Sequence, residues 1–434
     1  MPEVIVVGAG PVGLTLAAQL GLRGVDVLLL ERRVDRGRHS RAIGIHAPVL
    51  AALEPSGHVD RILASALRVH RGEARDGAGR LLGTVRFDRL STRFPFVATL
   101  PQPLTEEALG VGAPAPLRGV TVREVRPAGD RVRARAVSDD GEREWTAAIV
   151  VVATGSGGRH LVYRPGAVAV RHYPDRYVMA DLDVGPRADD DDVAVVTLAP
   201  GGVLESFPLP GSRRRFVAWD GRGDDPAPHD AAHRLQRAIA ERGRTSVEVD
   251  ASASTFRVRR VVVPRLRRDR IVVVGDGAHE VSPIGGQGMN LGLLDALGLA
   301  PLLAQWVHTG TAPAAELDAW ERRRVRSARI AAALATVNTA LGRPTLGRPT
   351  LGRPTLGNPA LPLPDAARSA LLRLMLAGPS GSLFAHAYAM GFDRDASTVR
   401  RPKYPPAAPP GGGPRASSSG RALGRADVGE PAPG

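Results

Sequence analysis

The 434-residue sequence contains no cysteine, a single lysine (Lys403) and few aromatic residues. Without cysteine the fold cannot depend on disulfides, and thiolate metal sites are excluded. An aromatic share of 4% argues against a base-stacking surface for nucleic acid. The net charge of +14 comes from arginines spread along the chain, which indicates codon bias more than a nucleic-acid interface.

The amino-terminal region lacks a basic segment followed by an apolar one. Its apolar run, Val4–Val7, is too short for a signal peptide or a membrane span. None of the 11 histidines has metal-ligand spacing, so we expect no metal site. These absences predict a cytoplasmic protein with no nucleic-acid partner and no membrane span.

A glycine motif, "GAGPVG", follows this apolar run at residues 8–13. In a strand–turn–helix unit, the first glycine makes a tight turn, the second lets a pyrophosphate approach the backbone, and the third lets helix and strand pack closely. The amino end of the helix then attracts the phosphates. The predicted cofactor-binding residues here are Gly8, Gly10, Pro11, Val12 and Gly13.

An acidic residue, Glu31, ends the next apolar strand. A carboxylate at this place accepts hydrogen bonds from ribose hydroxyls and repels a 2′-phosphate. The unit therefore suits the ADP half of FAD or of NAD, and this motif does not choose between them.

A second glycine-rich strand ending, "IVVVGDGAHEVSPIGGQGMN", occupies residues 271–290. Asp276 follows the buried strand, where open α/β sheets place their ligands. The glycines after Pro283 allow backbone to lie against a flat ligand, and Met289 and Asn290 open a helix with a positive amino end. A nicotinamide cofactor would not need this second cradle, whereas FAD is long enough to occupy both. We therefore expect FAD.

Four segments together resemble the p-hydroxybenzoate hydroxylase-like, single-component FAD monooxygenases. They are "VIVVGAGPVGLTLAAQLGLRGVDVLLLER", "SRAIGIHAPVLAAL", "PFVATLPQPLTEEAL" and "GDGAHEVSPIGGQGMNLGLLDALGLA", and the resemblance covers about residues 3–335. It implies a Rossmann-like FAD domain with an inserted, mainly antiparallel β substrate domain. By this resemblance the FAD contacts include Arg41, Gln102, Asp276, Pro283, Gly286, Gly288, Met289 and Asn290.

The middle of the chain departs from the family pattern. The family has an Asp-Gly pair after the strand in "AAIVVVATGSGG" (147–158), and here Thr154 stands where the aspartate is expected. The arginine that normally follows is out of register, and Arg159 or Arg164 are the candidate substitutes. The departure leaves FAD binding as the expectation and puts efficient reduction by NADPH in question.

The arginines after Glu31 are candidate contacts for the NADPH phosphates, with an ordinary solvated basic loop as the alternative. They are Arg32, Arg33, Arg36 and Arg38.

The resemblance implies an FAD-dependent monooxygenase that oxygenates an aromatic or polyketide-like small molecule. Reduced flavin would react with oxygen to a C4a-hydroperoxide, with NADPH or NADH as the transient reductant. The alternatives are a dehydrogenase- or reductase-type tailoring enzyme without oxygen insertion, and a degenerate FAD-binding protein. A halogenase is disfavoured because the chain lacks the paired tryptophans of that group.

No catalytic dyad is evident, because the flavin carries the chemistry. His279 and Pro283 are candidates near the ring, and His279 also suits a role in shaping its loop. The candidate substrate contacts are His46, Tyr177, Phe207 and Trp219, each of which also suits an ordinary core position.

The predicted organisation is discontinuous. Residues 1–66, 94–165 and 265–340 would form the FAD domain, and residues 67–93 and 166–264 the β-sheet substrate domain. A five-residue repeat, "LGRPT" from 341, and further helices would fill 341–399. The Pro-, Gly-, Ser- and Arg-rich segment 400–434 is expected to be disordered.

Overall fold

The computed structural model describes residues 1–35, 42–185, 192–223, 230–243, 247–344 and 365–393. The LGRPT repeat and the carboxyl tail lie outside the described residues, as do Arg36, Arg38 and Arg41. The predictions for these segments therefore stay predictions.

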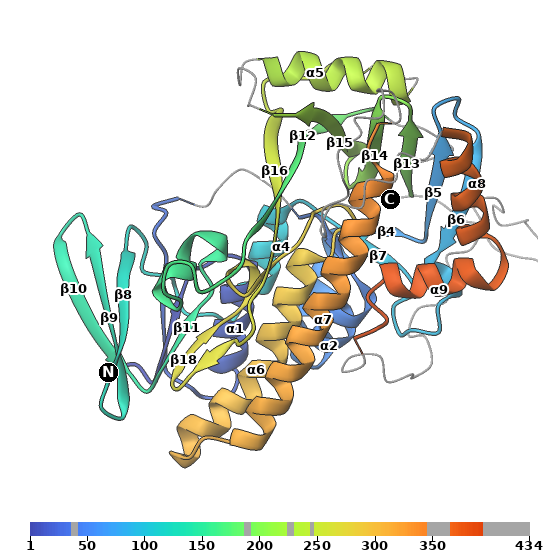
Figure 1. The fold of residues 1–434 in the computed structure, drawn as a ribbon. Helices are drawn as coiled ribbons and strands as arrows, with labels where there is room; N and C mark the ends of the chain where they lie inside the picture. Colours follow the sequence, from blue (N-terminus) through green and yellow to red (C-terminus); the bar gives the residue numbers. More distant parts are fainter. Residues whose placement is uncertain (36–41, 186–191, 224–229, 244–246, 345–364, 394–434) are drawn as a thin grey trace, which may run out of the picture. The chain divides into compact units, whose positions relative to one another are not determined.

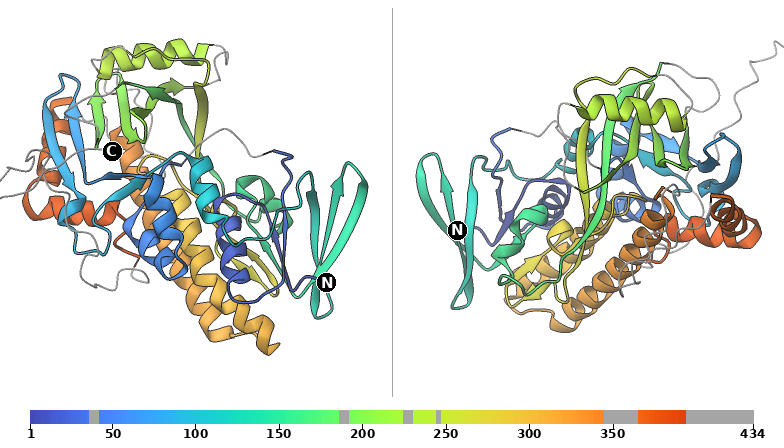
Figure 2. Two further views of the ribbon diagram at one scale, coloured as in Figure 1. Left: turned by 180° about the vertical axis from the view of Figure 1, so that it is seen from behind. Right: turned by 45° about the horizontal axis from the view of Figure 1, so that its top comes forward.

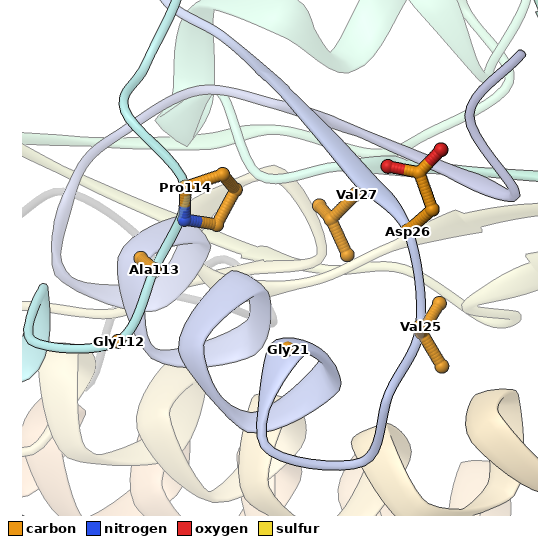
Figure 3. A pocket seen from close by; sticks show the side chains of 7 residues that line it. All are labelled: Gly21, Val25, Asp26, Val27, Gly112, Ala113 and Pro114. Atoms are coloured by element: carbon orange, nitrogen blue, oxygen red, sulfur yellow. The ribbon is translucent and has the colours of Figure 1, made fainter.

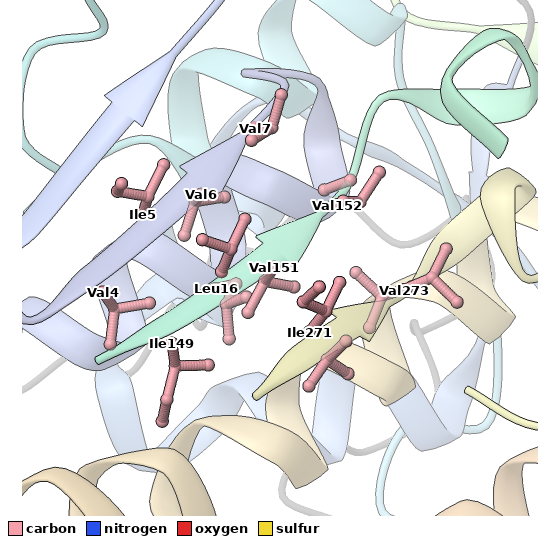
Figure 4. Packing of buried hydrophobic residues seen from close by; sticks show 14 of the residues in the cluster. Val4, Ile5, Val6, Val7, Leu16, Ile149, Val151, Val152, Ile271 and Val273 are labelled. Atoms are coloured by element: carbon pink, nitrogen blue, oxygen red, sulfur yellow. The ribbon is translucent and has the colours of Figure 1, made fainter. Parts of the chain in front are cut away.

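The central sheet has five strands in the order β17-β18-β11-β1-β2, and all but β17 run parallel. Its inner strands are runs of branched apolar residues that are buried throughout, as expected for strands covered on both faces. Figure 4 shows their side chains gathered around Leu16 of the first helix. The strands are β1 (Val4–Val7), β2 (Val27–Leu30), β11 (Ile149–Val152), β17 (Arg267–Arg268) and β18 (Ile271–Val273).

Three helices complete this core: α1 (Pro11–Gly21), α6 (Gly288–Thr309) and α7 (Ala314–Leu341). α6 packs against both α1 and α7, and α6 and α7 run side by side in Figure 1. Among the described helices, only α6 is long and apolar enough to match a membrane span, and 61% of its most apolar stretch is buried inside the protein. Its apolarity is that of a core helix.

An antiparallel sheet of three strands adds its apolar side chains to the same core. Its strands are β8 (Thr121–Ala128), β9 (Arg131–Ser138) and β10 (Gly141–Ala147).

The largest sheet has eight strands, in the order β19-β16-β12-β15-β14-β13-β5-β6. Neighbours are antiparallel except β13 and β5, which pair in parallel. Helix α5 (Ala231–Ala238) lies across these strands (Figures 1 and 2). The strands are β5 (Arg71–Asp76), β6 (Leu81–Arg86), β12 (Arg171–Asp183), β13 (Val193–Ala199), β14 (Gly202–Leu209), β15 (Arg213–Arg222), β16 (Ser254–Val262) and β19 (His279–Glu280).

The two faces of this sheet have different neighbours, because successive side chains of a strand point to opposite faces. Leu204 and Phe216 pack with α5 on one face. Val203 and Val217 pack on the other face, with Ile284 of the second glycine loop. The second face is therefore the one directed at this glycine loop, residues 283–288, which is expected to contact the flavin ring and is called the flavin loop below.

Short elements connect the two large sheets. A second three-stranded sheet has the order β3-β7-β4, and three short helices lie between or after its strands in the chain. These elements are β3 (Gly44–Ile45), α2 (Ala47–Leu53), α3 (His58–Ser65), β4 (Leu67–Val69), β7 (Val97–Thr99) and α4 (Gln102–Leu109).

The carboxyl-terminal helices α8 (Asp365–Leu376) and α9 (Gly378–Tyr388) pack against β6. Arg368 of α8 donates to the carbonyls of Leu198 and Ala199, at 3.1 Å each. After α9, the buried Asp393 carboxylate accepts from Arg324 of α7 at 2.8 Å.

The architecture agrees with the predicted class: a Rossmann-like parallel sheet, a mainly antiparallel β region and a carboxyl-terminal helical segment. The eight-stranded sheet draws on both segments assigned to the β region. The domain boundaries themselves stay a prediction.

The buried ion pair of Arg324 and Asp393 should support the docking of the carboxyl-terminal helices. Asp393→Ala removes the carboxylate that this guanidinium faces, with both side chains at most 3% exposed. We expect a loss of about 3–5 kcal/mol in the free energy of unfolding, measured by urea denaturation. Asp318→Ala is the control, because its carboxylate is 50% exposed beside Arg267 and should cost under about 1 kcal/mol. Equal, small losses in both variants would contradict this view.

Candidate functional site

The first glycine turn is held by close backbone contacts. Gly8 has φ +108°, which favours glycine, and its N–H donates to the Leu30 carbonyl at 2.7 Å. A Cβ at Gly13 would lie 1.8 Å from the Gly8 carbonyl oxygen, whereas a Cβ at Gly10 would meet nothing within 4 Å. The first and third glycines are therefore required by packing, and the space above Gly10 is open for a ligand.

Helix α1 begins directly above this open space. Gly10 is its N-cap and supplies no side-chain hydrogen bond, and Pro11 occupies the first turn. The first N–H groups of a helix lack partners within the helix, and here no capping side chain satisfies them. This uncapped amino end, beside a residue without a side chain, fits a pyrophosphate.

Glu31 is held in place by the same turn. Its carboxylate accepts the Ala9 N–H at 2.8 Å, and the Arg33 N–H and Nε at 3.0 and 3.1 Å. Burial alone would raise the pKa of Glu31, but these donors outweigh it and hold the pKa below its usual value. A carboxylate has about four acceptor sites, so Glu31 retains capacity for a ribose hydroxyl.

The second glycine motif packs directly on the first. A Cβ at Gly292 of α6 would lie 2.6 Å from Cγ2 of Val12 and 2.9 Å from Cα of Gly275. The start of α1 and the segment from Gly275 to Gly292, which are far apart in the sequence, therefore lie in close contact. The carboxyl ends of β1 and β18 and the amino ends of α1 and α6 form one continuous edge, which suits a single elongated cofactor.

Asp295 of α6 fixes the loop that carries Asp276. One Asp295 carboxylate oxygen accepts the Gly275 N–H at 3.1 Å and lies 2.6 Å from Nε2 of His279. The side chains of Asp295 and His279 are both buried. The Asp295 carbonyl accepts from the indole of Trp320 at 3.2 Å. His279 thus faces the protein interior and shapes the loop, and the Asp276 side chain is left exposed at the sheet edge.

Asn290 joins the second motif to the segment around His46. Its side chain accepts the His46 N–H at 2.8 Å and donates to the carbonyls of Gly44 and Gly286, at 2.9 and 3.0 Å. Burial lowers the pKa of His46 to about 4. A hydrogen bond with the Gly286 backbone raises the pKa, but burial has the larger effect. His46 is therefore neutral near pH 7 and lies beside Gly286 of the flavin loop.

The segment around Thr154, where the family has an aspartate, contacts the second glycine motif through an arginine. The Thr154 hydroxyl is buried without a hydrogen-bond partner, against Gly158. Arg159 donates to the carbonyls of Asp276 and Gly277, at 2.8 and 3.0 Å, and pairs with Glu280 at 3.3 Å. Arg159 thus clamps the backbone of the Asp276 loop, while Arg164 is exposed.

The other predicted cofactor residues are placed as follows. Gln102 begins α4 and donates to Glu106 at 2.9 Å. Pro283 is exposed, and its carbonyl accepts the Gly286 N–H at 2.8 Å. Gly288 and Met289 open α6 and are partly exposed.

The arginines after Glu31 differ in what they contact. Arg33 is engaged by Glu31, and Arg32 is exposed.

The aromatic candidates share the sheet face that is directed at the flavin loop. Tyr177 and Trp219 are directly opposed on β12 and β15, and Tyr177 stacks on Phe256 with ring centroids 5.6 Å apart. Phe207 lies two residues beyond Glu205 on β14, on the same face. Their roles toward a substrate stay predictions.

A surface hollow of about 350 Å³ lies elsewhere, between the end of α1 and the start of β2. Figure 3 shows it lined by Val25, Asp26 and Val27 on one side and by Pro114 on another. It is at the amino end of β2, whereas ligands of such sheets bind at the carboxyl ends. We therefore assign no role to it.

Sequence reasoning missed two residues that organise the site, Gly292 and Asp295. Both share one helix face with Gly288, at i, i+4 and i+7. Asp295 is an acidic residue on an otherwise apolar face of α6, and this contrast was the signal in the sequence that could have identified it. Gln287 donates to the carbonyls of Ala387 and Tyr388, at 3.2 and 3.1 Å. The sequence did not predict this contact, because no local pattern indicates a partner 100 residues away.

The His279 and Asp295 pair should make stability depend on pH. Burial alone would lower the pKa of His279, but the Asp295 carboxylate outweighs it and raises the pKa. A raised pKa gives stability that is fully present below the ordinary value of about 6.5 and lost as pH rises through the folded value. Asp295→Asn should therefore destabilise more at pH 6 than at pH 8.5, in urea titrations at both pH values. Exposed Glu107→Gln is the control, and a pH-independent loss for Asp295→Asn would refute the assignment.

Two glycine variants should separate cofactor contact from packing. Gly10→Val places a side chain in open space, so the fold should persist while FAD affinity falls about a hundredfold, from a clash of roughly 3 kcal/mol. Gly13→Val meets the Gly8 carbonyl and should lower stability by about 3 kcal/mol. Flavin absorbance after gel filtration and thermal melting report the two effects. A Gly10→Val protein that retains FAD would exclude this turn from the site.

Comparison with known proteins gives matches over the same region. The family model described as "FAD binding domain" matches residues 1–335. The chain is 33% identical over 359 residues to 6-methylpretetramide 4-monooxygenase of Streptomyces rimosus, covering 78% of this chain and 63% of that protein. It is 32% identical over 332 residues to rifampicin monooxygenase of Streptomyces venezuelae, covering 75% and 68%. The chain thus spans about two thirds or slightly less of these relatives.

A solved structure shares the fold. The p-nitrophenol 4-monooxygenase of Pseudomonas putida superposes with a TM-score of 0.76 at 22% identity, over 92% of this chain and 99% of that one. The family match confirms the resemblance found in the sequence and agrees with the fit of the two glycine motifs to one long dinucleotide. The chain therefore belongs to the FAD-binding-domain family of p-hydroxybenzoate hydroxylase-like monooxygenases, and FAD is its cofactor.

Proposed function

We propose that this protein is an FAD-dependent monooxygenase that inserts one oxygen atom into an aromatic or polyketide-like small molecule. NADPH or NADH would supply two electrons, and the second oxygen atom would leave as water. The observation that carries the proposal is the contact of Val12, Gly275 and Gly292, which joins the two glycine motifs into one cofactor edge. The relatives named as monooxygenases of 6-methylpretetramide and rifampicin support the substrate class.

The protein residues would bind and orient the cofactor. Bound FAD supplies the redox chemistry and the activation of dioxygen. The amino end of α1 would hold the pyrophosphate, and Glu31 a ribose. Asp276 would accept ribityl hydroxyls on a backbone that Arg159 and Asp295 hold rigid. The amino end of α6 would stabilise negative charge on the reduced ring.

The apolar face of the eight-stranded sheet would exclude water from the reacting atoms. Val203 and Val217 line this face, and Ile284 of the second glycine loop packs with them. Exclusion of water protects a reactive oxygen species from side reactions. The substrate would therefore lie between this face and the flavin loop.

Thr154 gives a specific reason to keep a second function in view. Its buried, unpartnered hydroxyl stands where the family has a carboxylate, and Arg33 is already engaged by Glu31. These two features predict slow reduction by NADPH. The alternative is an FAD-dependent dehydrogenase or reductase that inserts no oxygen.

An assay with isotopically heavy dioxygen tests the proposal. The FAD-loaded protein is supplied with NADPH or NADH and a panel of hydroxylated naphthacenes and anthraquinones. We expect substrate-stimulated oxidation of the nicotinamide and a product carrying one heavy oxygen atom. The Gly10→Val variant, which should not retain FAD, is the matched control.

The possible results separate the alternatives. Product formation without oxygen would favour the dehydrogenase or reductase. A protein that binds FAD but shows no stimulated nicotinamide oxidation with any compound or reductant would overturn both enzymatic functions and indicate a degenerate flavoprotein.

A further inference from the structure

The sheet face directed at the flavin loop carries a carboxyl group that the fold does not use. Glu205 lies in the middle of β14 and is 3% exposed. Its direct neighbours across the ladder are Val196 of β13 and Val217 of β15. Among the described residues we find no hydrogen bond or ion pair to its carboxyl group. An acid in such surroundings is costly unless something satisfies it.

The orientation of Glu205 follows from the alternation of β14. Leu204 belongs to the apolar cluster on the α5 side of the sheet, whereas Val203 belongs to the cluster on the opposite side, which also contains Ile284 and Leu372. Glu205 therefore points to the same side as Val203 and Ile284. Burial raises the pKa of Glu205 to about 8, so the carboxyl is mostly protonated near pH 7 and can donate a hydrogen bond.

A second unsatisfied group shares this face. Tyr177 is fully buried, and its hydroxyl has no hydrogen-bond partner. Burial raises the pKa of this hydroxyl, and the carboxylates of Asp175 and Glu205 raise it further. The pKa of Tyr388, at the flavin loop, is raised by burial and then by Glu205. The carboxyl group therefore lies within electrostatic range of both tyrosines.

We propose that the neutral Glu205 carboxyl is a substrate-binding group, which donates a hydrogen bond to a carbonyl oxygen of a planar, uncharged hydroxyketone. The Tyr177 hydroxyl supplies a second polar contact. This inference rests on the proposed function, because it names the substrate class of that site. A substrate with an anionic carboxylate would be excluded, because the arginines that the described residues place near this face are already paired. Arg343 and Arg222 face Asp175, and Arg215 is held by Asp181 in two hydrogen bonds, at 2.6 and 2.8 Å.

Equilibrium binding to the FAD-loaded protein, without nicotinamide, tests this inference. The probes are 1,8-dihydroxyanthraquinone, an uncharged hydroxyketone, and anthraquinone-2-carboxylate, an anion of similar size. Perturbation of the flavin absorbance reports binding. We expect the wild type to prefer the hydroxyketone, and Glu205→Leu to weaken its binding about tenfold or more, the usual effect of an unmade buried hydrogen bond.

Two further variants exclude a merely structural role. Glu205→Gln retains an N–H donor and should weaken binding of the hydroxyketone by less than about threefold. Glu248→Leu is the matched control, because Glu248 is exposed in the same β region. Thermal melting of Glu205→Leu should be unchanged or higher, because the variant removes a buried acid without a partner.

The outcomes are separable from those of the oxygenation assay. Equal binding of the hydroxyketone by wild type and Glu205→Leu overturns the inference, even if the protein proves to be a monooxygenase. A wild type that binds neither probe, or that prefers the anion, overturns it as well. Loss of hydroxyketone binding in a well-folded Glu205→Leu supports it, even if no oxygen insertion is ever observed.

Discussion

The site depends on one steric constraint, the close approach of α6 to the amino end of α1. A helix can lie this near to another backbone only where a side chain is missing, and Gly292 provides that opening against Val12 and Gly275. Any larger residue would separate the two glycine motifs by the width of a side chain. One continuous edge would then become two separate helix ends, and an elongated cofactor would lose its common support.

Polar contacts make this edge rigid. Asp295, buried on α6, holds the Gly275 N–H and His279, and so fixes the loop of Asp276 from within. Arg159 holds the same loop from outside, through its backbone carbonyls. Preorganised loops lose little entropy when a ligand binds. The exposed Asp276 side chain is thus supported by two buried or half-buried partners that never need to touch the ligand.

The β-sheet region adds a different kind of surface. Its face toward the flavin loop is apolar around Glu205, and the arginines described near it form ion pairs, as Arg215 does with Asp181 and Arg343 with Asp175. A neutral acid and a tyrosine hydroxyl in such surroundings recognise hydrogen-bonding groups without attracting charge. In the proposed function, the cofactor edge would hold a charged dinucleotide, and this face would select an uncharged substrate.

The sequence alone determined the elements whose signal is local. Branched apolar runs beside glycine turns give buried parallel strands, and the spacing of residues 8–13 gives a phosphate turn, because these patterns report φ angles and burial within a few residues. It also placed Glu31 and Asp276 at strand ends. The tertiary structure decided what depends on distant neighbours. Only the packing of α6 on α1 shows why Gly292 and Asp295 matter. Only the alternation of side chains along β14, beside the flavin loop, shows that Glu205 is placed to contact a substrate. Contacts over such separations leave no periodic trace in the chain, since they are set by the register of strands and the seating of helices.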